Sequence, residues 1–234
     1  MNKDDITISV MSTFRRSVEQ DKRISSILAK VKAGKATQRD IATYADLLGK
    51  HASDAFEKYV DYKNFSDSAV KGAIKKALNS NYLSINGQAA LELRAEDKRK
   101  GLSIAIKKQK DFRTDEYLKR LEAATEEAFK TELVEGAKTT ARQYYDDFQK
   151  TNVELREKLG YDEVVIRIYD DVGLRNRTQP CQFCMERAGE YKYSEARSLG
   201  IFQRHEGCGC HIEISTPQWT RDQKEWKTNT WTDR

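Results

Sequence analysis

The sequence predicts a mainly α-helical protein in three parts: an elongated helical region over residues 1–160, a small α+β metal-binding module over 161–215, and a C-terminal tail over 216–234. Three observations carry this division. Pro180 is the first proline of the chain, and the sequence before it is rich in strong helix formers such as Ala, Lys, Glu and Leu. All four cysteines and two of the three histidines then fall between Cys181 and His211. All three tryptophans lie between Trp219 and the C-terminus, so the composition changes sharply along the chain.

The composition favours a thin core. Hydrophobic residues make up 38% of the chain, charged residues 34%, and the mean hydropathy is −0.81. The net charge is +5, and residues 161–234 hold 11 basic and 12 acidic residues, so the excess lies in the helical region. This excess is too mild to indicate a dedicated nucleic-acid-binding protein. No apolar run approaches the ~18 residues of a membrane span, and the first residues lack the apolar stretch of a secretory signal, so no membrane segment is expected.

Apolar side chains recur every three or four residues near the N-terminus, which is typical of amphipathic helices. This spacing predicts a first helix that carries the apolar residues from Val10 to Val31. The pattern Thr37-x-x-Asp40 resembles a capping box, with Asp in place of the usual Glu, and predicts the start of a second helix. The apolar stripe of that helix continues to Tyr59.

A short helix capped by Ser66 is expected to reach Leu78. Residues 81–112 fit both a short strand and a helical turn, so they receive no assignment. His51 is the only histidine outside the Cys/His cluster. It lies on the polar side of the predicted helix, so we expect it to be solvated.

Thr114, followed by two acidic residues, predicts the N-cap of a long helix that runs to Leu159. An unbroken helix of this kind would be roughly 60 Å long at ~1.5 Å per residue. Gly136 is the natural place for a bend, and Gly160 is expected to end the helix. The aromatic residues Tyr144, Tyr145 and Phe148 are expected in the core.

The hydrophobic period changes from helical spacing to two after Gly160. Residues 164–168 alternate as a strand does, and His211–Ile214 predicts a second short strand. We therefore place a domain boundary near residue 160.

The Cys/His cluster predicts a structural Zn²⁺ site. Two spacings, C-x2-C and H-x2-C-x-C, place soft ligands at the separation that one tetrahedral ion requires. The five favoured ligands are Cys181, Cys184, His205, Cys208 and Cys210, of which four are needed. The spacing does not decide which one is spare. His211 points away from Cys210 in an extended segment. We therefore expect it either at the surface or next to a ligand without binding the ion itself.

Catalysis by this cluster is not expected. The fragments P-C-x-x-C at 180–184 and H-x-E at 211–213 both occur in zinc deaminases, but here their order is reversed and Cys208 and Cys210 have no role. A nucleophilic cysteine paired with His205 is disfavoured, because four clustered thiols indicate a metal. The lack of an export signal favours thiolate ligands over disulfides. We therefore expect no enzymatic activity and no small-molecule substrate.

The stretch from Arg177 to Ile214 resembles the C-terminal domain of the minor head proteins of tailed bacteriophages, the head-morphogenesis family related to phage Mu protein F. In that family an Arg-Thr stretch leads to a cysteine with a glycine five residues beyond it, and a variable segment precedes H-x2-C-x-C and a short strand. The matching residues are Arg177, Thr178, Cys184, Gly189, His205, Cys208 and Cys210. Cys181 gives the variant with a paired cysteine, and Gly209 stands where the family commonly has Arg.

The resemblance implies a component of the virion that lies inside the head near the portal vertex and is made in the host cytoplasm during assembly. It implies a role in head morphogenesis, with the portal and major capsid proteins as partners, and in some members an aid to DNA packaging or ejection. The alternative is a zinc-ribbon nucleic-acid-binding protein with a helical arm, which predicts salt-dependent binding to DNA.

Two further features concern partners. The densest basic stretch is either a solvated helix face or a contact to the backbone of packaged DNA, and it comprises Lys98, Arg99, Lys100, Lys107, Lys108 and Lys110. The tail carries Trp219, Trp226 and Trp231 among polar residues that cannot bury three indoles. We expect the tail either to fold back over the metal module or to dock on portal or capsid protein.

Overall fold

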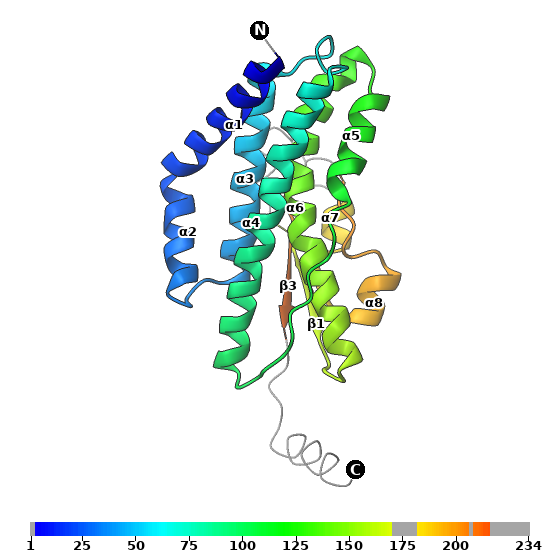
Figure 1. Cartoon of the computed structure of the whole chain (residues 1–234). Helices are drawn as coiled ribbons and strands as arrows, with labels where there is room; N and C mark the ends of the chain where they lie inside the picture. Colours follow the sequence, from blue (N-terminus) through cyan, green and yellow to red (C-terminus); the bar gives the residue numbers. More distant parts are fainter. Residues whose placement is uncertain (1–2, 170–181, 206–207, 216–234) are drawn as a thin grey trace.

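The computed structural model of the protein describes residues 3–169, 182–205 and 208–215. These residues form a helical bundle followed by a small antiparallel sheet, which confirms the predicted fold class (Figure 1). The helices of the bundle are α1 (Lys3–Gln20), α2 (Lys22–Lys32), α3 (Gln38–Tyr59), α4 (Ser68–Arg99), α5 (Arg113–Ala123) and α6 (Glu126–Lys158). The elements that follow are β1 (Val164–Ile168), α7 (Gln182–Glu186), β2 (Gly189–Lys192), α8 (Tyr193–Ser198) and β3 (His211–Ser215).

The N-terminal helices begin at residues whose side chains bind free backbone amides. Asp21 separates α1 from α2 and accepts a hydrogen bond from the Arg23 amide, so the single helix expected through Val31 is two helices. The predicted capping box at Thr37 is confirmed, because the Thr37 hydroxyl accepts from the Asp40 amide and the Asp40 carboxylate accepts from the Thr37 amide. The expectation for His51 is wrong, since its Nε2 lies 3.0 Å from the Asp21 carboxylate and its side chain is buried.

Helix α4 differs most from the expectation. It is capped by Asp67 rather than Ser66, and it runs for 32 residues instead of ending near Leu78. The unassigned stretch therefore divides, because residues 81–99 complete α4 and residues 102–112 follow as an extended segment. Asn152 of α6 holds that segment by accepting from the Lys107 amide at 2.9 Å and donating to the Lys107 carbonyl at 3.0 Å.

The long helix expected from Thr114 is also two helices. Thr114 lies inside α5 and hydrogen-bonds Asp111, while Phe112 occupies the N-cap without a side-chain bond. The chain then breaks at residues 124–125, and the Thr125 hydroxyl caps α6. The expected bend at Gly136 does not interrupt α6. A Cβ atom at this position would lie 2.7 Å from the ring of Tyr117 in α5. Its missing side chain therefore allows α5 to pack closely on α6.

The core of the bundle lies where α3, α4 and α6 run side by side, with α1 and α2 on one side and α5 on the other (Figure 1). Tyr144, Tyr145 and Phe148 are buried in it, as predicted. Helices α3 and α6 approach each other closely at Gly49. A Cβ atom on Gly49 would lie 2.9 Å from the Cβ atom of Ala141 and 3.0 Å from the Cα atom of Lys138.

The sheet has the order β2-β1-β3 with both pairs antiparallel. The predicted strands β1 and β3 are confirmed, and the buried Val165 of β1 lies opposite Ile214. Strand β2 and helices α7 and α8 were not predicted. Apolar side chains of the sheet and α8 form a second cluster with Val153 of α6, separate from the core of the bundle.

A polar joint connects the sheet to the bundle. The side-chain amide of Gln38 pairs with the backbone of β3 as a neighbouring strand would, donating to the Ile214 carbonyl and accepting from its amide at 2.6 Å each. The fully buried Arg156 donates to both carboxylate oxygens of Asp97 at 2.8 and 2.6 Å. Directed bonds thus join the start of α3 to the sheet and the end of α6 to the end of α4.

Glu92 of α4 is buried beside this joint and is 3% exposed. Burial, together with the charges of Glu96, Asp97 and Glu213, raises the pKa of Glu92 to about 8. Its carboxyl group is therefore protonated in the folded protein at neutral pH, whereas the same group in the unfolded chain is ionised.

Replacing Gly49 by Ala should lower the free energy of unfolding by about 1–3 kcal/mol, because the added methyl group meets helix backbone that cannot move aside. Gly72→Ala is the matched control, since a Cβ atom on this exposed glycine of α4 would meet no atom within 4 Å. It should leave stability unchanged or raise it by up to about 1 kcal/mol. Urea unfolding of both variants measures the difference, and equal effects would exclude a tight contact between α3 and α6.

Glu92→Gln should raise stability increasingly as the pH rises from 5 to 8. In this window the unfolded chain releases the Glu92 proton and the folded protein keeps it, so wild-type stability falls by up to about 1.4 kcal/mol per pH unit relative to the variant. Urea unfolding at pH 5 and pH 9 tests this. Glu190→Gln at an exposed position of β2 is the control, and a gap between wild type and Glu92→Gln that does not change with pH would contradict the prediction.

Candidate metal centre

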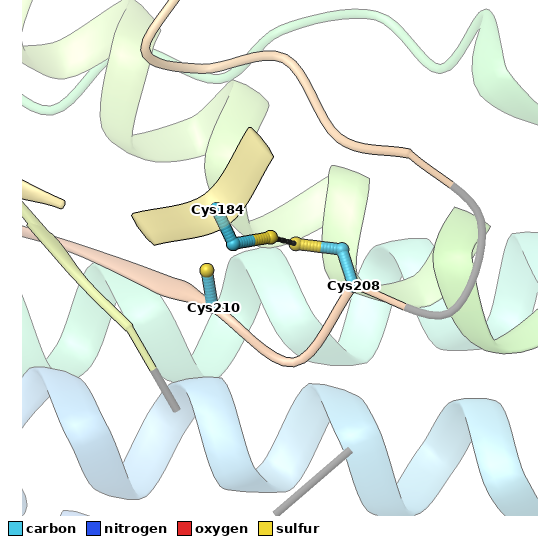
Figure 2. Close-up of side chains that lie close together, drawn as sticks. All are labelled: Cys184, Cys208 and Cys210. Atoms are coloured by element: carbon cyan, nitrogen blue, oxygen red, sulfur yellow. Dashed lines mark hydrogen bonds between the residues drawn. The ribbon is translucent and has the colours of Figure 1, made fainter. Parts of the chain in front are cut away.

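Three cysteine side chains meet where α7 approaches the segment before β3. Cys184 comes from α7, while Cys208 and Cys210 come from the stretch that leads into β3 (Figure 2). All three are buried, with exposed fractions of 2%, 1% and 2%. Their sulfur atoms lie within 4.8 Å of one another, so the fold brings together thiols that are far apart along the chain.

The distances suit one tetrahedral ion. The sulfurs of Cys184 and Cys208 are 3.5 Å apart, and Cys184 Sγ is 2.9 Å from Nε2 of His205. A tetrahedral Zn²⁺ with sulfurs at ~2.3 Å separates two of them by about 3.8 Å. Three thiols and an adjacent imidazole are also the ligand chemistry that structural zinc sites use. The chemistry and spacing of these donors therefore fit a metal ion.

Four of the five predicted ligands lie close together in the structure. Cys184, Cys208 and Cys210 form the cluster, and His205 contacts it through Cys184. Cys181 lies outside the described residues. His211 is buried rather than at the surface, and its Nε2 lies 3.3 Å from the Glu213 carboxylate.

Three arginines surround the cluster. Arg204 lies with Nη1 3.9 Å from Cys208 Sγ and donates to the Cys210 carbonyl. Arg167 of β1 lies with Nη2 3.7 Å from the same sulfur and donates to the Gln203 carbonyl. Arg142 of α6 donates to the Cys208 carbonyl. These side chains satisfy carbonyl groups of residues that lie in neither a helix nor a strand.

Each of two arginines is held by a carboxylate on the bundle. Asp146 of α6 accepts from Arg204, and this pair is buried with 2% and 3% of the side chains exposed. Asp46 of α3 accepts from Arg142. Although burial opposes it, the Asp146 carboxylate raises the pKa of Arg204, so this guanidinium stays charged. Breaking a buried pair of this kind by removing one partner typically costs about 3–5 kcal/mol.

The arginines favour negative charge on the cluster. The pKa of Cys208 is lowered to about 3 by a hydrogen bond from the Cys210 thiol and by the charges of Arg204 and Arg167, which together outweigh burial. That same hydrogen bond, with burial, raises the pKa of Cys210. The pair therefore carries a thiolate at neutral pH, and the thiolate is the form of cysteine that binds metal.

An aromatic contact covers the His205 side of the cluster. The Phe183 ring meets the His205 ring edge-on with centroids 5.4 Å apart, and the Arg187 guanidinium stacks on Phe183 at 3.7 Å. The cysteines are thereby enclosed by protein atoms on several sides.

Sequence reasoning missed the arginines and their carboxylates. Arg142, Asp146 and Arg204 carry no local signal, because charged residues are common throughout the chain. Arg167 does carry one. It shares the face of β1 on which Val165 is buried, and a charged residue at an inward position of a strand indicates a buried partner.

The residues predicted to contact DNA lie at the end of α4 and along the extended segment after it. Lys98, Arg99, Lys107, Lys108 and Lys110 are exposed, and Lys100 is half-buried. Lys100 pairs with Glu96 at 2.6 Å, and Arg99 donates to the Gly34 carbonyl at 2.7 Å. The tryptophans Trp219, Trp226 and Trp231 lie outside the described residues.

Within the described part of the chain, no helix combines the length and apolar composition needed to cross a membrane. No protein-family model, curated protein or solved structure matches this chain.

Proposed function

We propose that the cysteine cluster holds a structural Zn²⁺ ion, bound by Cys184, Cys208, Cys210 and His205. The observation that carries this proposal is the convergence of three buried sulfurs within 4.8 Å, with an imidazole in contact with one of them. Two arginines close to Cys208 would balance the negative charge of the thiolates. Cys181 would then be the spare candidate.

The burial of the ligands supports a structural role rather than catalysis. A catalytic zinc keeps one position open to water or substrate, whereas a structural zinc is closed by protein ligands. The three cysteines are almost inaccessible, and the Phe183 ring packs edge-on against the half-buried His205. A site of this kind contributes to the stability of a small sheet whose own apolar cluster is modest.

We further propose that the protein is a minor head protein of a tailed phage and acts in head morphogenesis near the portal. The support is the resemblance of residues 177–214 to that family, together with the contacts made by its cysteine and histidine positions. Cys184, His205, Cys208 and Cys210 are the positions that match the family pattern, and they are the residues that approach one another. A helical bundle with a small sheet held by a bound metal ion suits a component of an assembled particle.

The second candidate is a zinc-ribbon protein that binds DNA with a helical arm. The exposed side chains of Lys107, Lys108 and Lys110 on the extended segment favour it. The weak net charge of +5 argues against it, since binding to the DNA backbone depends on many phosphate contacts.

Freshly purified protein should contain about one zinc ion per chain, with thiols that react only after a strong chelator removes the metal. Zinc removal should cost on the order of 10 kcal/mol of stability in the sheet module. Cys184→Ser, Cys208→Ser and Cys210→Ser should each lose the metal while most helicity remains, because the core of the bundle is formed by α1–α6. Metal analysis, thiol titration and circular dichroism measure these effects. Metal-free protein with freely reactive thiols would exclude the site.

The paired variants His205→Ala and Cys181→Ser decide the fourth ligand. We expect His205→Ala to lower zinc affinity far more than Cys181→Ser, because the His205 ring contacts Cys184. Competition with a chromogenic chelator measures both affinities. The opposite order would assign the fourth position to Cys181.

The head-protein assignment predicts that the chain is present in few copies in purified heads and associates with the portal or major capsid protein. Quantitative mass spectrometry of purified heads and co-purification with each protein test this, and absence from heads would contradict it. The DNA-binding alternative instead predicts that the isolated protein binds duplex DNA with an affinity that falls steeply with salt. Under that alternative, substituting Lys107, Lys108 and Lys110 by Ala should reduce the dependence on salt.

A further inference from the structure

The middle of the outer face of α4 is apolar and open. The side chains of Leu83 and Leu91 are 62% and 49% exposed, and Gly87 lies between them at a spacing of four from each. A Cβ atom on Gly87 would meet no atom within 4 Å, so the space above the glycine is open. In Figure 1, α4 lies at the front of the bundle, and no described helix or strand passes in front of it.

Positive charges lie at both ends of this face. Lys76 precedes Gly87 by 11 residues, and Arg94 and Lys98 follow it by 7 and 11 residues. At roughly 100° per residue these three positions lie within about 20° of Gly87 around the helix, whereas every acidic residue of α4 lies about 80° or more away. The three cations are exposed, and none of them forms an ion pair with the residues that the structure describes. The face is therefore basic, apolar and again basic along its length.

Packing within the described chain does not explain the glycine at position 87. Glycine in the middle of a helix is destabilising relative to alanine, because it loses more conformational freedom on folding. Gly49 and Gly136 lie where two helices meet, whereas Gly87 has room for a side chain. A second helix laid on α4 would use this room, since a large apolar side chain of that helix fits the groove between neighbouring ridges.

Two copies of this face would repel each other. In an antiparallel pair of α4 helices that meet at Gly87, Lys76 of one copy lies close to Lys98 of the second copy. In a parallel pair each cation lies close to its equivalent. Both arrangements place like charges together, whereas carboxylates at both ends of a bound helix would be attracted. The charges therefore favour a binding partner that is acidic where α4 is basic.

We propose that the outer face of α4 binds an amphipathic helix of another protein, with a large apolar side chain over Gly87 between Leu83 and Leu91. Carboxylates of the bound helix then lie against the cations at each end, which are roughly 10–16 Å from Gly87 at ~1.5 Å per residue. The leucines supply apolar contact area, and the cations supply orientation and specificity. No residue of the cysteine cluster takes part, so this proposal depends neither on the zinc site nor on the assignment to phage heads.

A synthetic helical peptide tests the proposal, with leucines at its centre, glutamates at both ends and a length of about 22 residues. Fluorescence anisotropy of the labelled peptide, titrated with the full chain, should show saturable binding that weakens as salt is added. Replacing Lys76, Arg94 and Lys98 together by Glu should weaken this binding at least about tenfold, or ~1.4 kcal/mol. The same variant should bind a peptide that carries lysines in place of the glutamates.

Two further variants separate this face from general effects of charge and stability. Replacing Lys22, Lys32 and Lys35 together by Glu changes the net charge equally at exposed positions on and after α2, and it should leave binding within about twofold of wild type after correction for salt. Gly87→Leu should weaken binding at least about tenfold because it fills the open space. Its unfolding midpoint in urea should not fall, since leucine favours a helix more than glycine does.

Several results would overturn the proposal. These are no saturable binding of the acidic peptide to wild type, equal weakening by the two triple variants, or unchanged binding by Gly87→Leu. Sedimentation that depends on concentration in wild type but not in Gly87→Leu would assign the face to a second copy of the chain. Binding to phosphatidylserine vesicles that Gly87→Leu abolishes, without binding to the peptide, would assign it to a membrane surface.

Discussion

The buried pair between Arg204 and Asp146 fixes the position of the cysteine cluster. The described residues between Gln203 and Cys210 lie in no helix or strand that would satisfy their carbonyl groups, and Arg204 supplies one of the missing donors while lying near the sulfur of Cys208. The guanidinium can be buried there only because Asp146 of α6 neutralises it. The placement of the cysteines therefore depends on the placement of α6, and the bundle as well as the sheet positions the cysteine cluster.

The position of the sheet on the helices also depends on buried polar groups. Among the described residues, the hydrophobic core of the bundle and the cluster at the sheet are separate, and polar groups lie between them. Gln38 continues the sheet with its side-chain amide, and Arg156 joins the end of α6 to Asp97 of α4. Directed bonds of this kind define one orientation, whereas apolar contacts alone tolerate several. The buried Glu92 is the cost of this arrangement, because a carboxyl group surrounded by other acidic groups stays buried at neutral pH only in its neutral form.

These features agree with the proposed role in assembly. The three cysteines are almost fully buried, and α3 and α6 pack closely at Gly49. On α4, by contrast, residues 77–91 carry no charge, and Leu83 and Leu91 are exposed.

Much of the fold follows from local sequence. The helical spacing, the capping box at Thr37 and the alternation of residues 164–168 each act through neighbours within a few positions, so the helical region and two strands could be predicted. The spacing of the cysteines likewise placed Cys184, Cys208 and Cys210 among the five candidate ligands, and these three thiols meet in the structure. It did not decide which candidate is spare. What the tertiary structure decided is where helices end and what surrounds the thiols. The continuation of α4 to Arg99 depends on long-range burial of its inner face, and the break before Thr125 lets α5 fold back on α6.

The arginines around Cys208 come from β1, α6 and the loop before β3, and no spacing in the sequence relates them. Their role arises only when burial removes water and leaves the carbonyl groups and carboxylates of distant segments as their partners.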